Sequence, residues 1–598
     1  MPSTVFASRV FTATLAACTL SGCTESTVPR AGPVDASVTN DGGGPDVAYA
    51  RESSAGFAAA ESSLNNNSDA SVSDAAPEAA PVLVGVDDWD PTQLDSYDEV
   101  ALQSGLGELL RYGRGAAAVD VDGDGDDDIF VADGDNRWRG TWGSPEIFLN
   151  DGFGNFTRTD LGISDTDTTA TWGGAFADFD NDGDPDLLIV SGGYSLPSTL
   201  VLFENCISDG DGFQDVTAKL GIAPDSGLSD LFEWWGASWA DYDLDGYLDV
   251  IATRRNRGPA LFHNNQGTGF TEVGASVGLT LEDDKDYKNP TWIDYDEDGD
   301  PDLYLAGSLA HAFYRNDSGL FMEVTDSVFT QGLIVPSRMS FAAAAADFDQ
   351  DGHDDLYLGR WDYQDYVLFG DGAGGFEFVG AEGGLDAALA HNDNPSEPYE
   401  NTMGLGIGDI HDDGYPDIVV GSGDPEETGP DIIYCNARDR SFFRCTDLFV
   451  ETNDDHKQTR GHGAVFADFT GDGRNELYWS LGGAGRYDQE LIDVDSREVD
   501  KFFVRRTAAF APTAWLRLQG TISNRDAVGA RVTVNSGGVI RHFGVRSTAA
   551  FQSQNSHRHV VPTFGVTEAI ASILWPSGIR SEHKLHAGVH TLAIEPTQ

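Results

Sequence analysis

Acidic residues recur in this chain in a short pattern that suits a metal ion. The first copy reads Asp120-Val-Asp-Gly-Asp-Gly-Asp-Asp-Asp128, with carboxylates at positions 1, 3, 5 and 9 and glycine at position 6. Alternate residues of a tight turn can point inward, and the glycine permits the bend. Ligation by oxygen alone favours Ca²⁺, which accepts six to eight oxygens, over the stricter octahedron of Mg²⁺. The pattern predicts calcium-binding loops in which position 7 offers its backbone carbonyl.

Seven copies of the pattern, numbered loop 1 to loop 7, begin 58, 63, 53, 53, 62 and 59 residues apart. At positions 1, 3, 5, 7 and 9 the candidate ligands are Asp120, Asp122, Asp124, Asp126 and Asp128 in loop 1; Asp178, Asp180, Asp182, Asp184 and Asp186 in loop 2; Asp241, Asp243, Asp245, Tyr247 and Asp249 in loop 3; Asp294, Asp296, Asp298, Asp300 and Asp302 in loop 4; Asp347, Asp349, Asp351, His353 and Asp355 in loop 5; Asp409, His411, Asp413, Tyr415 and Asp417 in loop 6; and Asp468, Thr470, Asp472, Arg474 and Glu476 in loop 7. Loops 6 and 7 are degenerate, and metal binding by them stays open.

Two other interpretations of the loops are less favourable. An EF-hand needs an acid at position 12 and flanking helices. Position 12 is apolar in every copy: Val131, Ile189, Ala252, Leu305, Leu358, Val420 and Trp479. A solvated turn that binds nothing would cluster like charges without a counter-ion, and five intact copies in register argue against it.

The segments around the loops predict short strands. Small residues such as Ala116–Ala118 precede a loop, and strand formers such as Leu187–Val190 follow it. A second hairpin with a turn rich in Asn, Asp and Gly comes next, as from Ile147 to Phe156. Two hairpins per repeat make one propeller blade. We therefore predict an all-β fold with a seven-bladed β-propeller over residues 95–510, whose last blade is completed by the N-terminal strand around Tyr97–Ala101.

Residues 514–598 predict a small C-terminal β-rich domain. The loop pattern before it resembles the FG-GAP or VCBS repeat of integrin α-subunit propellers and many secreted bacterial proteins, which implies calcium loops that rigidify turns on one face. Trp515–Leu518, Asn524–Val532 and Ile573–Gly578 resemble motifs of the ASPIC/UnbV domain. Together the two parts are similar to the cartilage acidic protein family in a bacterial form, which implies an extracellular calcium-binding protein with a role in interaction or adhesion.

The N-terminus predicts export and a lipid anchor. Residues 1–22 combine Arg9 with the apolar run Val10–Leu20, too short to span a bilayer. Leu20-Ser-Gly-Cys23 resembles a bacterial lipobox, in which Cys23 is lipidated; an ordinary cleaved signal is the alternative. Residues 23–94, rich in Ala, Ser, Asn, Asp, Gly and Pro, predict a disordered acidic stalk. We expect a protein anchored at the outer membrane, on the cell surface or on its periplasmic face.

Composition excludes some partners. The 598 residues include 36 basic and 99 acidic side chains, for a net charge of −63. Such a surface repels nucleic acid and anionic membrane faces, so membrane contact is expected only through the lipid anchor.

Catalytic motifs do not stand out. The sequence contains no G-x-S-x-G elbow, CxxC pair or phosphate-binding Gly-Lys-Ser loop. His557 and His559 could form a metal pair, although a structural or solvent-facing role is favoured. Trp234, Trp235 and Trp292 could stack on sugars, but core packing is favoured.

The cysteines suit an oxidising compartment. Cys435 and Cys445 flank a hairpin turn and could form a disulfide, which would leave Cys206 free.

Two functions remain open at this point. The favoured one is a surface-tethered, calcium-binding interaction or adhesion protein with a protein or glycan ligand. The alternative is a secreted enzyme, like a lyase or cyclase, with its site at the propeller mouth or in the cleft between the propeller and the C-terminal domain.

Overall fold

The computed structural model describes most of the chain from residue 96 onward. The described residues are 96–107, 110–136, 141–163, 170–193, 196–222, 234–255, 257–279, 285–308, 311–329, 340–363, 365–380, 383–385, 400–423, 431–450, 460–482, 497–506, 513–548 and 553–597. The predicted export signal, Cys23 and the acidic stalk lie outside them. Residues 84–598 belong to one compact unit. Within the described part, no helix is long and apolar enough to cross a membrane.

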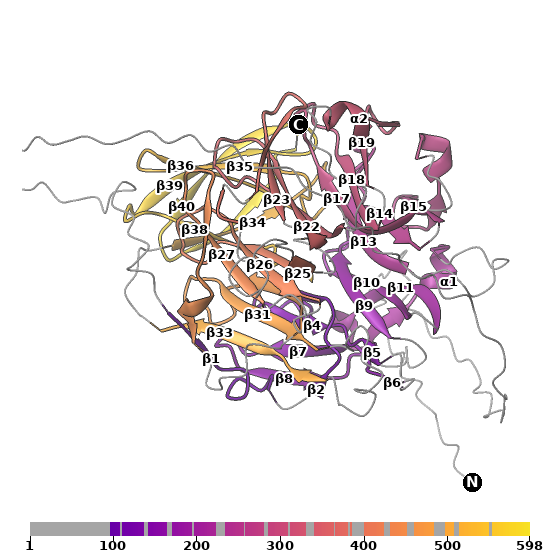
Figure 1. Ribbon diagram of the computed structural model, residues 1–598, viewed down its shortest axis with the longest axis horizontal. Helices are drawn as coiled ribbons and strands as arrows, with labels where there is room; N and C mark the ends of the chain where they lie inside the picture. Colours follow the sequence, from indigo (N-terminus) through magenta and orange to yellow (C-terminus); the bar gives the residue numbers. More distant parts are fainter. Residues whose placement is uncertain are drawn as a thin grey trace, which may run out of the picture. The chain divides into compact units, whose positions relative to one another are not determined.

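Each of the first six repeats forms a meander of four antiparallel strands (Figure 1). In chain order these are β3 (Ala116–Val119), β4 (Asp128–Val131), β7 (Glu146–Asn150) and β8 (Phe156–Thr159); β9 (Thr171–Ala177), β10 (Asp186–Gly193), β11 (Leu196–Cys206) and β12 (Gly212–Asp215); β13 (Trp234–Ala240), β14 (Asp249–Arg254), β15 (Arg257–Asn264) and β16 (Phe270–Glu272); β17 (Asp286–Ile293), β18 (Asp302–Ser308), β19 (Ala312–Asn316) and β20 (Phe321–Glu323); β21 (Ser340–Ala346), β22 (Asp355–Tyr363), β23 (Tyr366–Gly370) and β24 (Phe376–Val379); and β25 (Glu400–Gly408), β26 (Asp417–Ser422), β27 (Ile432–Asn436) and β28 (Phe442–Arg444). A short pairing of β22 with β25 joins the fifth and sixth meanders.

The last repeat borrows a strand from the start of the chain. Its own strands are β30 (Gly461–Ala467), β31 (Glu476–Leu481) and β33 (Lys501–Arg505). β1 (Tyr97–Glu99) pairs antiparallel with β33, and β29 (Phe449–Val450) lies beyond β1. This is the pairing predicted for the N-terminal strand, and it joins the two ends of the repeat array.

Every acidic loop connects the first strand of a repeat to the second. The first strand ends directly before position 1, and the second strand begins at position 9 in all seven repeats. The first strands are made of small and apolar residues and are almost entirely buried, as in β9 and β30. They contact one another in the order β3, β9, β13, β17, β21, β25 and β30, and β30 contacts β3 again.

The hydrophobic core lies between consecutive meanders. One cluster, for example, packs Phe130 and Ile147 of the first repeat against Phe176, Leu187 and Ile189 of the second. Because each sheet packs on its neighbours through both faces, the loops are held at equivalent places from repeat to repeat.

Short elements complete the repeat region. They are the pairs β2 (Leu110–Arg111) with β32 (Glu498–Val499) and β5 (Asp135–Asn136) with β6 (Thr141–Trp142), the helices α1 (Thr217–Leu220) and α2 (Thr325–Val328), and the 3-10 turns Ile207–Asp209, Gly274–Val277 and Thr446–Leu448.

The C-terminal part forms two further sheets. One contains β38 (His559–Pro562), β34 (Thr513–Gln519) and β41 (His590–Ile594); the other contains β36 (Val539–Gly544), β35 (Arg531–Ser536), β39 (Glu568–Leu574) and β40 (Arg580–His586). Their apolar faces share a core that includes Leu516, Val532, Ile573, Trp575 and Leu585. In addition, β37 (Ser553–Gln554) pairs in parallel with β3 of the first repeat.

Candidate metal centres

All seven loops share one backbone conformation, in which positions 4 and 6 are left-handed. Position 6 is glycine throughout, with φ between 81° and 110°. Position 4 has φ between 54° and 75°, in Gly123, Asn181, Leu244, Glu297, Gln350, Asp412 and Gly471. A bulky side chain in this region costs about 1 kcal/mol or more, so the loop shape is strongly imposed. The degenerate loops 6 and 7 keep it too.

Carboxylates at positions 1 and 9 fasten each loop to its surroundings. In loop 2, Asp178 accepts the backbone N–H groups of Asp182 at 2.9 Å and Gly183 at 2.8 Å. Loops 3, 5, 6 and 7 repeat this pair of bonds. Asp186, at position 9, accepts the N–H of Phe179 at 3.2 Å and that of Asn205, on the third strand, at 2.9 Å.

Several loops bring three carboxylates together. Ligand oxygens lie within 4.8 Å of one another in the groups Asp120, Asp122 and Asp128; Asp178, Asp180 and Asp186; and Asp241, Asp243 and Asp245. This all-oxygen donor set fits a hard divalent cation. The Asp-rich groups of the loops could therefore hold metal ions.

Electrostatics point the same way. Burial, then repulsion from Asp249, raises the pKa of Asp241 to about 8. Burial and the carboxylates of Asp296 and Asp294 raise the pKa of Asp302 to about 9. Groups so reluctant to ionise together are stabilised when a cation shares their oxygens, since it offsets both burial and repulsion.

The position-7 residues make a contact that the sequence did not indicate. Their backbone N–H groups donate to the position-5 carboxylate in loops 1 to 6, for example from Asp184 to Asp182 at 3.0 Å. Metal ligation by the carbonyl of position 7 stays a prediction.

In two intact loops, a basic residue from the repeat region itself contacts the candidate ligands. In loop 5, Arg440 from the last turn of the next repeat donates to Asp349 at 2.5 Å and lies 3.4 Å from Asp351. In loop 3, His263 lies 3.2 Å from Asp249, and this hydrogen bond raises the pKa of His263 to about 9. Both basic residues lie well outside the loop pattern, so the pattern alone could not reveal them.

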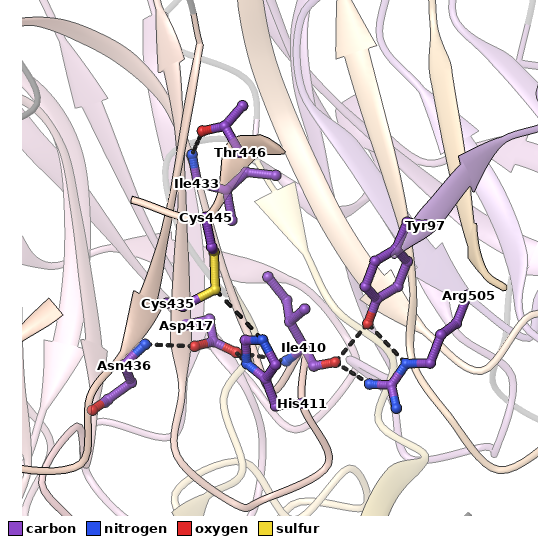
Figure 2. Close-up of a disulfide and its surroundings, with 10 residues drawn as sticks. All are labelled: Tyr97, Ile410, His411, Asp417, Ile433, Cys435, Asn436, Cys445, Thr446 and Arg505. Atoms are coloured by element: carbon purple, nitrogen blue, oxygen red, sulfur yellow. Dashed lines mark hydrogen bonds and ion pairs between the residues drawn. A yellow bond between two sulfur atoms is a disulfide. The ribbon is translucent and has the colours of Figure 1, made fainter. Parts of the chain in front are cut away.

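In the degenerate loops, the remaining carboxylates have protein partners. In loop 6, His411 lies 3.0 Å from Asp417 (Figure 2). Arg438, from a later turn of the same repeat, lies 2.6 Å from Asp413. Burial lowers the pKa of His411, but the Asp417 carboxylate raises it by more, so the pKa lies above its usual value. In loop 7, Thr470 donates to Glu476 through both its N–H and its hydroxyl. These contacts give the carboxylates hydrogen-bonding or positively charged partners, which is part of what a bound cation would provide.

A disulfide lies beside loop 6. Cys435 and Cys445 are bonded, as predicted, and the sulfur of Cys435 lies 3.5 Å from His411 Nε2 (Figure 2). Because that sulfur is in a disulfide, it is not a thiolate ligand, although it stands close to His411 and Asp417. Cys206 is disulfide-bonded as well, so the expectation that it is free was wrong.

The other side chains singled out from the sequence are structural. Trp234 and Trp235 are buried in the core, as favoured. Burial, then His557, lowers the pKa of His559 to about 3, and the His559 ring packs on Phe543. The His557 Nε2 lies 3.2 Å from the backbone carbonyl oxygen of Arg546.

Asparagines at the end of the third strand link neighbouring repeats. Each one donates its side-chain N–H to the carbonyl of position 2 in the preceding loop, at 2.7–2.9 Å. The pairs are Asn150 with Phe469, Asn205 with Val121, Asn264 with Phe179, Asn316 with Tyr242 and Asn436 with Phe348. In the sequence these residues look like ordinary turn residues, because nothing local shows what lies in the next sheet.

The last repeat replaces this asparagine by two residues. Tyr97 donates its hydroxyl to the Ile410 carbonyl at 2.6 Å, and the Arg505 guanidinium donates to the same oxygen (Figure 2). The pair Asn150–Phe469 then connects the first repeat to the last loop. Position-2 carbonyls in six of the seven loops are thus held by the following repeat.

Family models match segments of both the repeat region and the C-terminal part. A model described as FG-GAP-like repeat matches residues 120–189, 241–305 and 294–358, and a model described as ASPIC and UnbV matches residues 520–598. No curated protein matches the chain.

Solved structures give weak likenesses. They include an Agrocybe aegerita lectin described as recognising non-reducing terminal N-acetylglucosamine (16% identity, 56% of this chain and 80% of the lectin, TM-score 0.37). AofleA from Arthrobotrys oligospora (10%, 57% and 88%, 0.31) and Saccharomyces cerevisiae Sqt1 (10%, 66% and 88%, 0.36) are others. At these TM-scores they carry no argument about this chain. The family matches and the loop geometry together show a mostly β protein that carries FG-GAP-like repeats and a C-terminal ASPIC and UnbV domain.

Proposed function

We propose that the repeats form a seven-bladed β-propeller stabilised by Ca²⁺. The contacts between first strands that return from β30 to β3 support a closed ring, as does the completion of the last sheet by β1. The carboxylates of loops 1 to 5 would hold the ions. A bound Ca²⁺ would neutralise buried carboxylates and fix the turn between the first two strands of a blade.

We infer that this propeller is a binding scaffold rather than a catalyst. The observation that carries this proposal is the repetition of one strained loop in all seven repeats, with the same pair of position-1 bonds in five of them. Metal sites of this kind stabilise the fold, and they leave the surface of the propeller available for a partner. The ligand class is a protein or a glycan, and the chain would act at the cell surface like the cartilage acidic protein family that it resembles.

An array of glycans and proteins tests this function. The full chain loaded with calcium should bind a defined subset of the array, lose that binding in EDTA and regain it with excess calcium. A matched array scored for released products distinguishes a binding scaffold from the alternative, an enzyme of the lyase or cyclase kind, because an enzyme would consume its ligand. Turnover, or binding that is indifferent to EDTA, would contradict a calcium-stabilised binding scaffold.

The anchor has its own test. Cys23→Ala removes the sulfur that a lipobox lipidates, so the variant should leave the membrane fraction and appear as soluble exported protein. Fractionation with immunodetection measures the distribution, and Thr24→Ala, which keeps the cysteine, controls for a substitution at this site as such. A Cys23→Ala protein that still sediments with membranes would rule out this anchor.

A further inference from the structure

The C-terminal domain contacts the loops through positions that the metal pattern leaves unused. Its strong ion pairs go to positions 4 and 8, which alternate with the candidate ligands. Arg531 lies 2.6 Å from Glu297, at position 4 of loop 4. Arg558 lies 3.0 Å from Asp127, at position 8 of loop 1. Arg546 makes the equivalent pair with position 8 of loop 5 at 2.6 Å.

Loop backbones are contacted as well. The position-6 carbonyl accepts from Arg558 in loop 1 at 2.6 Å, from Arg531 in loop 5 at 2.5 Å and from Thr513 in loop 7 at 2.6 Å. At position 4, Gln350 exchanges two hydrogen bonds with the backbone of His542, at 2.7 and 3.0 Å. These groups face the domain only while the loop keeps its left-handed turn.

Contacts to the candidate ligands of the intact loops are weaker. Arginine nitrogens approach position-1 carboxylates only to 3.4–3.9 Å, in the pairs Arg525–Asp178, Arg517–Asp120 and Arg531–Asp294. The short bond to a position-1 carboxylate, from Trp515 to Asp468 at 2.6 Å, falls in the degenerate loop 7. In the intact loops, the short docking contacts thus go to groups other than the candidate ligands, so docking and metal binding do not compete for them.

A second set of contacts reaches the first strands. Ser547 bonds both the N–H and the carbonyl of Trp239, and Gln554 bonds both backbone groups of Phe176, at 2.7 and 3.0 Å. Asn555 accepts the N–H of the β30 residue Phe466 and donates to a carbonyl of β25. The domain therefore lies against the loop-side ends of the first strands, where the mouth of the proposed propeller would be.

We propose that metal binding in the loops and docking of the C-terminal domain are thermodynamically linked, so that the domain is a calcium-dependent latch over the loop face of the repeats. This inference rests on the proposed calcium loops. A cation that fixes the turn already orders the position-4 side chains and the position-6 carbonyls. Docking then costs less conformational entropy and is more favourable. Linkage is reciprocal, so docking must raise the calcium affinity by the same factor.

The reciprocal effect can be tested without changing any charge near the loops. The triple variant Ser547→Ala, Gln554→Ala and Asn555→Ala removes these side-chain hydrogen bonds to the first strands, while Asn535→Ala changes an exposed residue of β35 in the same domain. Hydrogen exchange of residues 541–548 and 553–558 reports docking, and calorimetric titration with calcium alone reports affinity. We expect at least tenfold faster exchange and at least fivefold weaker calcium binding in the triple variant, with Asn535→Ala unchanged.

The possible outcomes bear differently on the linkage and on the proposed calcium sites. Faster exchange with unchanged calcium affinity would overturn the linkage while leaving calcium binding intact. Failure of the parent protein to bind calcium would instead contradict the proposed function, and with it the calcium-dependent latch. If the triple variant does not fold, Gln350→Asn gives the same readouts, because it keeps a residue that tolerates the left-handed turn and shortens the reach to His542.

Discussion

Chelation is expected to remove most of the free energy of unfolding of the repeat region. A ligand that binds only the folded state stabilises it by about 2.7 kcal/mol per site at a hundredfold excess over its dissociation constant. Five intact loops would together contribute about 13 kcal/mol, which is comparable to the whole stability of a typical domain. Thermal unfolding followed by circular dichroism should therefore show a large fall in Tm in EDTA.

Calcium should restore the Tm better than magnesium, because the loops offer many oxygens without a strict octahedral arrangement. Parent protein carried through the same buffer changes without EDTA is the control. A melting curve that is the same with and without chelator would contradict a structural role for the ion.

The second large effect is expected at an asparagine between repeats. Asn264 is fully buried and donates to the carbonyls of Phe179 at 2.8 Å and Leu248 at 2.9 Å, while its side-chain oxygen accepts the N–H of Gly267 at 2.8 Å. Asn264→Ala removes three hydrogen bonds and leaves the buried carbonyls of Phe179 and Leu248 without these donors, which should cost about 3–4 kcal/mol. Denaturant unfolding in saturating calcium measures the loss.

The neighbouring Asn265→Ala is the matched control. Asn265 is exposed and its side-chain bonds lie at the surface, so the expected cost is below about 1 kcal/mol. Equal losses from the two variants would show that the link between repeats contributes nothing specific.

The repeated hairpins and the acidic loops could be predicted from the sequence because both are local patterns. Strand alternation, turn residues and the spacing of Asp within nine residues are all readable along the chain. The pairing of the strand at Tyr97 with the last repeat followed from the same reasoning, since that strand had no acidic loop of its own.

Other features depend on what lies across a gap between sheets. Leu244 adopts a left-handed conformation that its residue type disfavours, and Asn264 bonds a carbonyl 85 residues away. Arg440 reaches loop 5 from the following repeat, and Arg558 reaches loop 1 from the C-terminal domain. No periodicity records such neighbours, so the sequence could place the carboxylates but not the groups that hold or compensate them.

Calorimetric titration of chelator-treated protein with calcium, below its melting temperature, tests the central claim most directly. The proposed loops predict at least five sites in the parent. Asp182→Ala, in loop 2, should lose one site, whereas Thr470→Ala, in the degenerate loop 7, should lose at most a weak one. A parent that takes up no calcium, or an Asp182→Ala variant with every site retained, would contradict the assignment of these loops as calcium centres.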